Sequence, residues 1–403
     1  MSAAPLTTPT RQARLARAAV AALFLTNGTV FFNIVPRYPQ IKADLGLSNA
    51  VFGTALAAHP IGALLAGLLA GAAIRRFRSA RVGALGIVVT TVATLFIPFV
   101  PNWVAFGGVL FVVGALDAIV DVAQNAHGLR VQRLYGRSIV NSLHGVWSVG
   151  AVLGGLMGSA AAGLDIPLAV HLGISATLFS VTALVAYRFL LPGPEDAERP
   201  AEVQDGHPPR REGWRSFTGS AVRMLAALGV LAACGTLVED AGASWGALYL
   251  SGDLRTDAAT AGMAVVALQV AMTVGRLTGD RVVDRFGQRT VVRAGGALAA
   301  IGMGAALAVP SVATSLAGFA LAGLGVATLV PAAMHTADEL PGLPAGAGLT
   351  IVSWLLRGGF LLSPPLVGFV ADLTSLRVGL LSVVLAGAVT VVLGRVLVNR
   401  TRA

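Results

Sequence analysis

Acidic side chains lie within long apolar stretches of this sequence, and they are the residues best suited to do chemistry. Asp117 and Asp121 are one helical turn apart in one stretch, and Glu239 and Asp240 are adjacent in another. An ionisable group in hydrocarbon costs on the order of several kcal/mol unless it faces a partner or water. Two carboxylates one turn apart also repel each other unless one of them carries a proton. The pattern indicates a polar interior that takes up and releases protons, with Asp117 and Asp121 as proton-coupling groups.

Polar residues recur around these aspartates at the spacing of one helix face. They are Asp117, Asp121, Gln124, Asn125 and Gly128, at i, i+4, i+7, i+8 and i+11. This spacing places them on one side of an α-helix. The same stripe also fits a buried seam of hydrogen bonds between helices, so the sequence leaves two interpretations open.

Aromatic residues and a histidine are candidates for solute binding. Trp245 and Trp354 either anchor helices at a membrane interface or stack on a flat solute. His144 either shuttles protons or is a packed, hydrogen-bonded histidine. We predict a substrate-binding site made by Asn33, Asn125, His144, Trp245 and Arg357.

The elements that must position these residues are membrane-spanning helices. Of the 403 residues, 55% are hydrophobic and 12% are charged, and 49 are glycine, a composition typical of closely packed helices in lipid. Twelve apolar stretches are long enough to span a bilayer. They cover residues 18–39, 50–74, 82–100, 104–127, 138–163, 166–190, 220–250, 258–280, 291–309, 312–335, 347–371 and 376–398.

One long hydrophilic run, Leu191–Phe217, divides the chain into two halves that repeat each other. Gly53 and Phe77, for example, recur 209 positions later as Gly262 and Phe286. We predict an all-α integral membrane protein, with two pseudosymmetric six-helix bundles around a central cavity. The predicted parts are an N-terminal tail (1–17), a bundle (18–190), a linker (191–217), a second bundle (218–398) and a C-terminal tail (399–403).

The formal net charge of +10 reports topology. Nearly all basic residues at the ends of the predicted spans fall on one side, and only Arg37, Lys42, Arg255 and Arg377 fall at the opposite ends. By the positive-inside rule, both termini and the linker are cytoplasmic in a multi-pass protein of the cell inner membrane, and no nucleic-acid partner is indicated. The single cysteine, Cys234, excludes an internal disulfide and a Cys-based metal site. We expect no cofactor and no metal, and a monomer whose partners are a small-molecule solute, protons and the lipid bilayer.

A loop motif between the eighth and ninth spans reads Gly275-Arg276-Leu277-Thr278-Gly279-Asp280, followed by Asp284-Arg285-Phe286-Gly287-Gln288-Arg289. It resembles the cytoplasmic loop signature of the major facilitator superfamily, and the likeness covers essentially the whole chain. In the first-half copy, Arg75 and Arg78 stand where the signature has Asp and Gly. The alternative is a solvated loop with favourable charge near a helix start. The resemblance implies a cytoplasmic gate made by Gly275, Arg276, Asp280, Asp284, Arg285, Gly287 and Arg289.

Further residues resemble the fucose-permease-like, sugar-proton-permease-like branch of this superfamily. They are Asp121-Val122-Ala123-Gln124-Asn125-Ala126-His127-Gly128, His144-Gly145, Glu239 with Trp245, and Pro364-Pro365. The resemblance implies that Glu239, rather than Asp240, is a third proton-coupling carboxylate. Arg357 stands where an uncharged residue is expected, so sugar specificity is not carried over.

Two classes of function fit these residues. The first is a secondary active transporter, a proton symporter or alternatively a drug or metabolite efflux antiporter, whose bundles rock about a central site. The second is a membrane-embedded enzyme or a non-transporting sensor. The sequence lacks H-E-x-x-H, a Walker loop and G-x-S-x-G, so we predict no enzyme. Because mid-span acids outnumber the mid-span cation Arg357, we predict a small polar solute that is neutral or cationic. We also expect a charged Asp121 to pair with Arg357, and protonation to release it.

Overall fold

The structure is a computed structural model, and its regular elements are helices throughout the described residues. It describes residues 10–135, 139–195, 197, 219–340 and 347–397. Most of the predicted linker, the start of the N-terminal tail and the C-terminal tail lie outside the described residues. Within the described part of the chain, 12 helical stretches are long and apolar enough to cross a membrane. The predicted all-α membrane class and the predicted number of spans are therefore confirmed.

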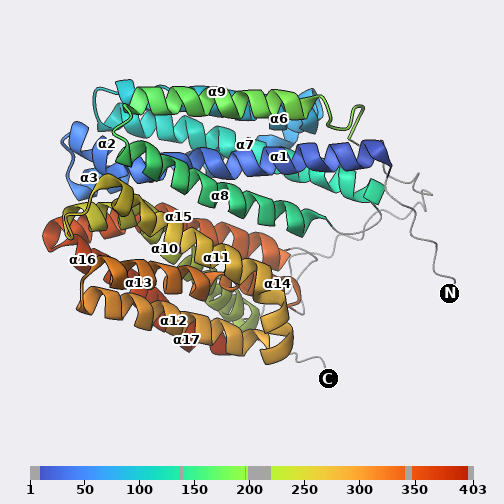
Figure 1. The fold of residues 1–403 in the computed structure, drawn as a ribbon. Coiled ribbons are helices and arrows are strands. Elements are labelled where there is room, and N and C mark those ends of the chain that lie inside the picture. The colour runs from blue at the N-terminus through green and yellow to red at the C-terminus, as the bar shows by residue number, and fades with distance from the viewer. Residues whose placement is uncertain (1–9, 136–138, 196, 198–218, 341–346, 398–403) are drawn as a thin grey trace. The chain divides into compact units, whose positions relative to one another are not determined.

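Each half of the chain contributes a run of helices in chain order (Figure 1). The first half contains α1 (Arg11–Ile34), η1 (Val35–Arg37), α2 (Tyr38–Asp44), α3 (Asn49–Leu56), α4 (Ala58–Gly67), α5 (Ala70–Phe77), α6 (Ser79–Thr94), η2 (Ile97–Phe99), α7 (Trp103–Tyr135), α8 (Val140–Gly163) and α9 (Leu168–Tyr187). The second half contains α10 (Gly219–Gly252), α11 (Ala258–Phe286), α12 (Gln288–Ala308), α13 (Val312–Val326), α14 (Leu329–Asp338), α15 (Ala347–Leu373), α16 (Leu376–Gly379), α17 (Leu381–Leu393) and η3 (Gly394–Val396).

Proline accounts for several interruptions within the spans. Pro36 lies at the start of η1 and Pro39 at the start of α2, in the first turn, where the missing N–H has no intrahelical partner to lose. Pro364 and Pro365 lie inside α15 instead, where each removes a helical hydrogen bond.

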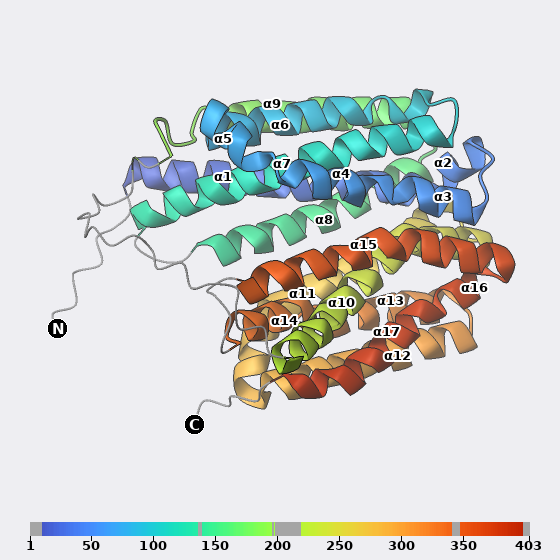
Figure 2. The ribbon, with the colours of Figure 1, turned by 180° about the vertical axis from the view of Figure 1, so that it is seen from behind.

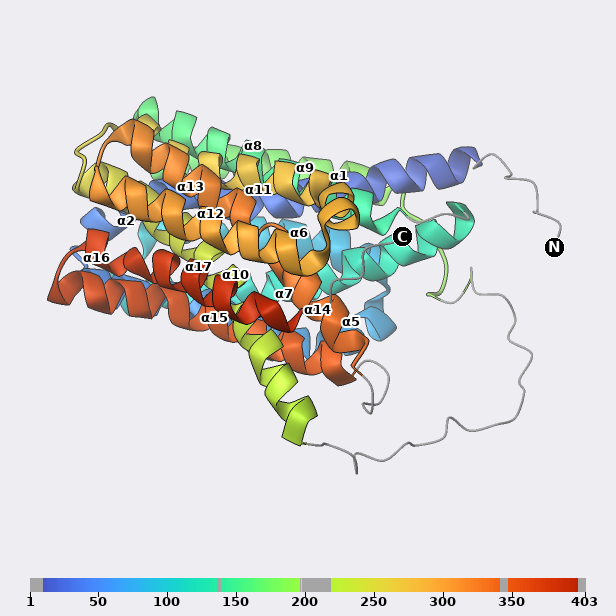
Figure 3. The same cartoon turned by 90° about the horizontal axis from the view of Figure 1, so that it is seen from below.

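Contacts divide the chain into two compact units. Unit 1 is residues 1–33, 58–154 and 166–206, and unit 2 is residues 34–57, 155–165 and 207–403. In unit 1, α7 packs against α4 and α6, and α6 packs against α9 (Figure 2). In unit 2, α10 packs against α15, and α12 packs against α13 and α17 (Figure 3). Unit 2 also holds α3 against α15 and η1 against α11, so it includes ends of the first-half spans.

The repeat of 209 residues extends to the backbone. Arg78 ends α5 with φ 72° and ψ 149°, and Gly287 ends α11 with φ 80° and ψ 145°. Arg76 and Arg285, two residues earlier, each lie over the ring of the following phenylalanine, at 5.4 and 5.3 Å from its centroid. The two halves therefore share the conformation of this turn, although the residue with the positive φ is arginine in the first half and glycine in the second.

A glycine at equivalent positions in the two halves allows a close helix contact in each. A methyl group on Gly114 would collide with the carbonyl oxygen of His59, and one on Gly323 would collide with that of Leu268. Gly323 and Leu268 lie 209 positions after Gly114 and His59, respectively. Glycine thus brings α7 against α4, and α13 against α11, at backbone distance.

Candidate functional site

Asp117, on α7 in unit 1, is joined to α1 and α8 through one amide. Asn27 on α1 donates a hydrogen bond from Nδ2 to Oδ1 of Asp117, at 2.9 Å. The Oδ1 atom of the same amide accepts a hydrogen bond from Nε1 of Trp147 on α8, also at 2.9 Å. The carboxylate is therefore held by a neutral donor whose other end is fixed to a third helix.

Asp121 takes part in a second arrangement of the same kind. Asn125, one turn further along α7, donates from Nδ2 to Oδ1 of Asp121 at 3.0 Å. Its Oδ1 atom accepts a hydrogen bond from Nε2 of His144 on α8, at 3.1 Å. Gln124 donates to the same carboxylate oxygen at 3.4 Å. Asp121 and His144 are exposed, which leaves this second arrangement open to solutes or water.

Together the two arrangements form a ladder between α7 and α8, because both the acids and their partners on α8 are about one turn apart. We call it the amide ladder, and it consists of Asp117, Asn27, Trp147, Asp121, Asn125 and His144. The structure thus brings together four residues that the sequence predicted for the site. The ladder also contains Asn27 and Trp147, which the sequence did not predict for the site, although a polar residue in an apolar span was the available signal for Asn27.

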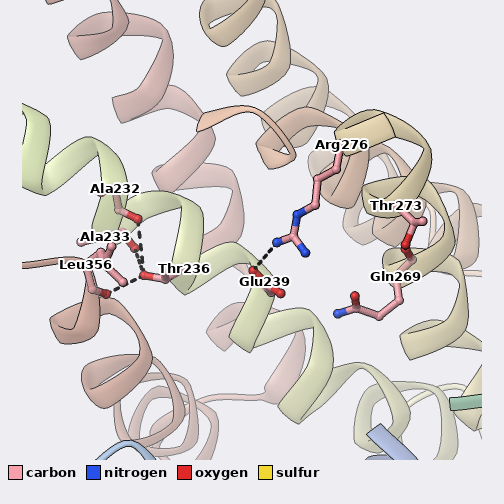
Figure 4. Close-up of polar contacts among 8 residues, drawn as sticks. All are labelled: Ala232, Ala233, Thr236, Glu239, Gln269, Thr273, Arg276 and Leu356. Atoms are coloured by element: carbon pink, nitrogen blue, oxygen red, sulfur yellow. Dashed lines mark hydrogen bonds and ion pairs between the residues drawn. The ribbon is translucent and has the colours of Figure 1, made fainter. Parts of the chain in front are cut away.

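Glu239 in unit 2 has a charged partner. Arg276 on α11 donates from Nη2 to Oε2 of Glu239 on α10 at 3.2 Å, and the two side chains are 34% and 14% exposed (Figure 4). The sequence predicted Glu239 as a proton-coupling group and Arg276 as part of a gate. The structure joins them in one ion pair, because α10 and α11 pack together.

A buried amide lies about two helical turns before Arg276 on α11. Gln269, on α11, is 1% exposed, and within the described residues neither its nitrogen nor its oxygen has a hydrogen-bond partner (Figure 4). A buried polar group without a partner costs about 1–3 kcal/mol. The arrangement of Glu239, Arg276 and Gln269 therefore offers hydrogen bonds to a polar ligand, and a ligand that bound Gln269 would remove this cost.

The remaining predicted solute-binding residues have other surroundings. Asn33 is 1% exposed, and both ends of its amide bond to α9, through His171 and Ser175. Trp245 is fully buried, with its ring 6.1 Å from that of Phe52. Arg357 is exposed, and its guanidinium lies 5.9 Å from the ring centroid of Trp354.

The predicted gate residues occupy the end of α11 and the start of α12. Gly275 lies close to Ala327, so that α11 and the end of α13 approach closely. Gly287 forms the turn, and Arg289 donates to the carbonyl oxygen of Leu397 at 2.7 Å. Asp280, Asp284 and Arg285 are exposed.

An unpredicted contact closes the other end of unit 2. Asp372, at the end of α15, accepts hydrogen bonds from the backbone N–H groups of Asn49 and Ala50, at 2.9 and 2.8 Å. These groups begin α3, where a helix favours negative charge. The contact joins residues 323 positions apart, so no local signal in the sequence could have shown it.

The structure shows no candidate metal centre in the part of the chain that it describes. Among those residues no group of three or more His, Cys, Asp or Glu side chains could hold a metal ion.

Comparisons with known proteins agree with this architecture. The sequence matches the family model described as Major Facilitator Superfamily over residues 20–244 and 231–403. Membrane protein MosC of Rhizobium meliloti is 31% identical over 377 residues, which cover 93% of this chain and 88% of that protein. The solved structure of the nucleoside transporter NupG has a TM-score of 0.72 at 14% identity, covering 96% of this chain and 98% of its own. The transporter FucP, in its outward conformation, has a TM-score of 0.60 at 15% identity, covering 96% and 99%.

The two structural likenesses show a shared fold, and the family match covers nearly the whole sequence. Members of this family carry solutes across membranes and are not enzymes. The chain therefore belongs to the Major Facilitator Superfamily, as a multi-pass membrane protein and secondary transporter that moves small solutes by alternating access.

Proposed function

We propose that this chain is a proton-coupled symporter of a small polar solute that is neutral or cationic. The observation that carries the proposal is the amide ladder, in which two acids one turn apart on α7 are each bonded to a neutral amide. Neither amide cancels a negative charge, and the two charges repel each other. A proton on one acid relieves both problems, so the ladder supports proton uptake.

The ladder also supports coupling between proton uptake and helix movement. Asn27 donates to a charged Asp117, but a protonated carboxyl group can itself become the donor. The amide of Asn27 is fixed at its other end to Trp147 on α8. A change of protonation therefore changes a hydrogen bond that holds α1, α7 and α8 together, and the exposed His144 offers a route for the proton.

Solute recognition is proposed for the ion pair and the buried amide in unit 2. Glu239 and Arg276 together carry no net charge, and Gln269 is neutral with an unused donor and acceptor. Such a set favours hydroxyl, amide or ring-nitrogen groups over a strong anion. NupG is by its name a nucleoside transporter, and nucleosides carry groups of this kind, so nucleosides stand beside sugars among the solutes to test first. Asn33, whose amide is bonded at both ends to α9, and Trp245, whose ring packs against that of Phe52, are left out of direct solute contact. Arg357, whose side chain is exposed, is retained.

The moving bodies are proposed to be the two six-helix halves, residues 18–190 and 218–398. The arginine-rich ends of the spans support an inner-membrane protein with both termini and the linker in the cytoplasm. The contacts of α3 and η1 within unit 2 then belong to the outer side of the membrane.

Transport in proteoliposomes tests the proposal. A panel of sugars, nucleosides, amino acids and cationic compounds is first screened by thermal shift, because a bound ligand stabilises the native state. With the solute so found, Asp121→Asn is expected to keep solute exchange and to lose uptake driven by an imposed pH difference. Arg357→Ala is expected to impair both, and Asp338→Asn, an exposed acid on α14, serves as the matched control. Uptake by Asp121→Asn against a solute gradient, with only a pH difference imposed, would show that Asp121 has no coupling role.

A further inference from the structure

Four arginines line an open pocket at one end of unit 1, where α5 ends and α6 begins. The pocket has a volume of about 680 Å³, and Arg11, Arg78, Arg81 and Arg188 lie on its wall. They come from the start of α1, the α5–α6 turn, the first turn of α6 and the end of α9. We call this site the arginine pocket. Arg81 also donates to the hydroxyl oxygen of Tyr187 at 3.4 Å, which fixes one guanidinium on the wall.

Among the described residues of the wall, no acidic side chain balances these charges. None of the described residues that line the pocket is Asp or Glu. Glu195, an acid at the same end of the unit, accepts a hydrogen bond from the backbone N–H of Ser79 at 2.8 Å and lies 3.8 Å from Arg130. Four guanidinium groups around one pocket create a strong positive potential. Their planar donors match the oxygens of a phosphate group.

The backbone of Arg78 is a second, independent observation. Its φ of 72° and ψ of 149° lie in a region that is essentially reserved for glycine, and the corresponding residue in the second half is indeed Gly287. An arginine at this turn is strained where a glycine would be relaxed. This strain is explained if the guanidinium group of Arg78 binds a ligand in the pocket.

The second half has no arginine at the four positions that correspond to the pocket. The repeat of 209 residues places Ser220, Gly287, Thr290 and Leu397 at the positions of the four arginines, and none of these residues is basic. The positive-inside rule predicts cations at this end of the spans, but it does not predict that four of them surround one pocket. Exposed apolar side chains adjoin them, since Leu15 and Phe189 line the same pocket. Headgroup-level positions of membrane proteins combine these two features.

We propose that the arginine pocket binds a phosphate group, carried either by an anionic phospholipid or by a soluble phosphate. The apolar neighbours suit the acyl chains of a lipid, and the guanidinium groups suit the phosphate of either source. Binding at this site joins the ends of α1, α5, α6 and α9, and so stabilises the end of unit 1 from which the linker leaves.

The test compares both sources on the purified, delipidated full-length protein. One arm adds phosphatidylglycerol or phosphatidylcholine and measures the bound lipid by native mass spectrometry and the melting temperature. The other arm adds inorganic phosphate, with chloride at equal ionic strength as its reference. We expect phosphatidylglycerol or phosphate, or both, to raise the melting temperature more than the matched reference does.

Variants of Arg78 separate binding from folding. Arg78→Gly is expected to raise the melting temperature of the ligand-free protein, because it relieves the backbone strain, and to reduce the anion-induced shift by at least half. Arg78→Gln keeps the strain and should reduce the shift by the same fraction without any gain in stability. Arg76→Gln, on α5 but outside the pocket wall, should behave like the unmodified protein. Equal shifts in all four proteins, or no preference for phosphate groups over the references in either arm, would overturn the proposal.

Discussion

Asp117 in the first half and Glu239 in the second half are held by opposite kinds of partner. In the first half, Asp117 accepts a hydrogen bond from the neutral amide of Asn27, whereas in the second half Glu239 pairs with the guanidinium of Arg276. An amide leaves the charge of a carboxylate in place, and a guanidinium cancels it. A proton can therefore neutralise the carboxylate of Asp117, whereas the charge of Glu239 is already balanced by Arg276. This difference is why our proposal gives proton coupling to the first half and solute recognition to the second.

Breaking the ion pair is expected to have the largest effect. Arg276→Gln leaves the carboxylate of Glu239 without its counter-charge, and the free energy of unfolding should fall by about 2 kcal/mol. The double variant with Glu239→Gln should recover most of this loss.

Asp117→Asn exchanges one acceptor for another opposite Asn27, and it should change the free energy of unfolding by less than about 0.5 kcal/mol.

Unfolding in detergent, arranged as a double-mutant cycle, measures these differences. The cycle isolates the coupling between Glu239 and Arg276 from the effects of each substitution alone. A loss for Asp117→Asn as large as that for Arg276→Gln would show that the two halves do not differ in the way described.

The spacing of residues on one helix predicted part of the site. Asp117, Asp121 and Asn125 share a face of α7 because helical geometry fixes it, and the structure finds them in one ladder. The fold class followed in the same way, from the length and composition of the apolar stretches. Both depend on local features of the chain, and local features are what a single sequence contains.

Contacts between distant parts of the chain escaped prediction. Asn27 lies 90 positions from Asp117, and Arg276 lies 37 positions from Glu239. The side chains involved are ordinary, and only helix packing brings them together. The burial of Trp245 was not predicted for the same reason, because its ring packs against Phe52, which lies in the other half of the sequence.

Two equivalent helices, α3 and α11, begin in different ways. Ser48 caps α3 and Asp257, 209 positions later, caps α11. The start of α11 needs only its own Asp257, but the start of α3 also receives the carboxylate of Asp372 from α15. A cap from the same segment persists when helices separate, whereas a cap from a distant helix is lost. Asp372 is therefore suited to hold this end of unit 2 closed.

Removing the distant cap should have an intermediate effect on opening. Asp372→Asn weakens the interaction with the start of α3 by about 1 kcal/mol, which corresponds to roughly a fivefold rise in the open fraction. The alkylation rate of a cysteine placed at the buried Leu248 should rise by about the same factor. Asp257→Asn should leave this rate unchanged, since its partner Thr260 lies on its own helix. An equal rise in both variants would mean that Asp372 is only another helix cap.

The local cap itself gives the smallest expected effect, which appears only in acid. The pKa of Asp257 lies below its usual value because Thr260 donates to the carboxylate from its hydroxyl, at 2.6 Å, and from its backbone N–H, at 3.0 Å. The folded protein thus binds fewer protons at this group than the unfolded chain, whose carboxyl has a pKa of about 3.9. The stabilisation is fully present above that pH and is lost as the pH falls through the lower, folded-state pKa.

Replacing Asp257 by serine, the residue that caps α3, keeps a cap but removes the titrating group. Melting temperatures of Asp257→Ser and of the unmodified protein should therefore run parallel from pH 7 to pH 5. Below about pH 4 the unmodified protein should lose stability more steeply. Thr260→Val removes the strongest donor to the carboxylate, so it should flatten the same acid slope while Asp257 is still present. If neither substitution alters the slope, the hydrogen bonds from Thr260 do not lower the pKa of Asp257, and the two helix starts differ only in the distant carboxylate of Asp372.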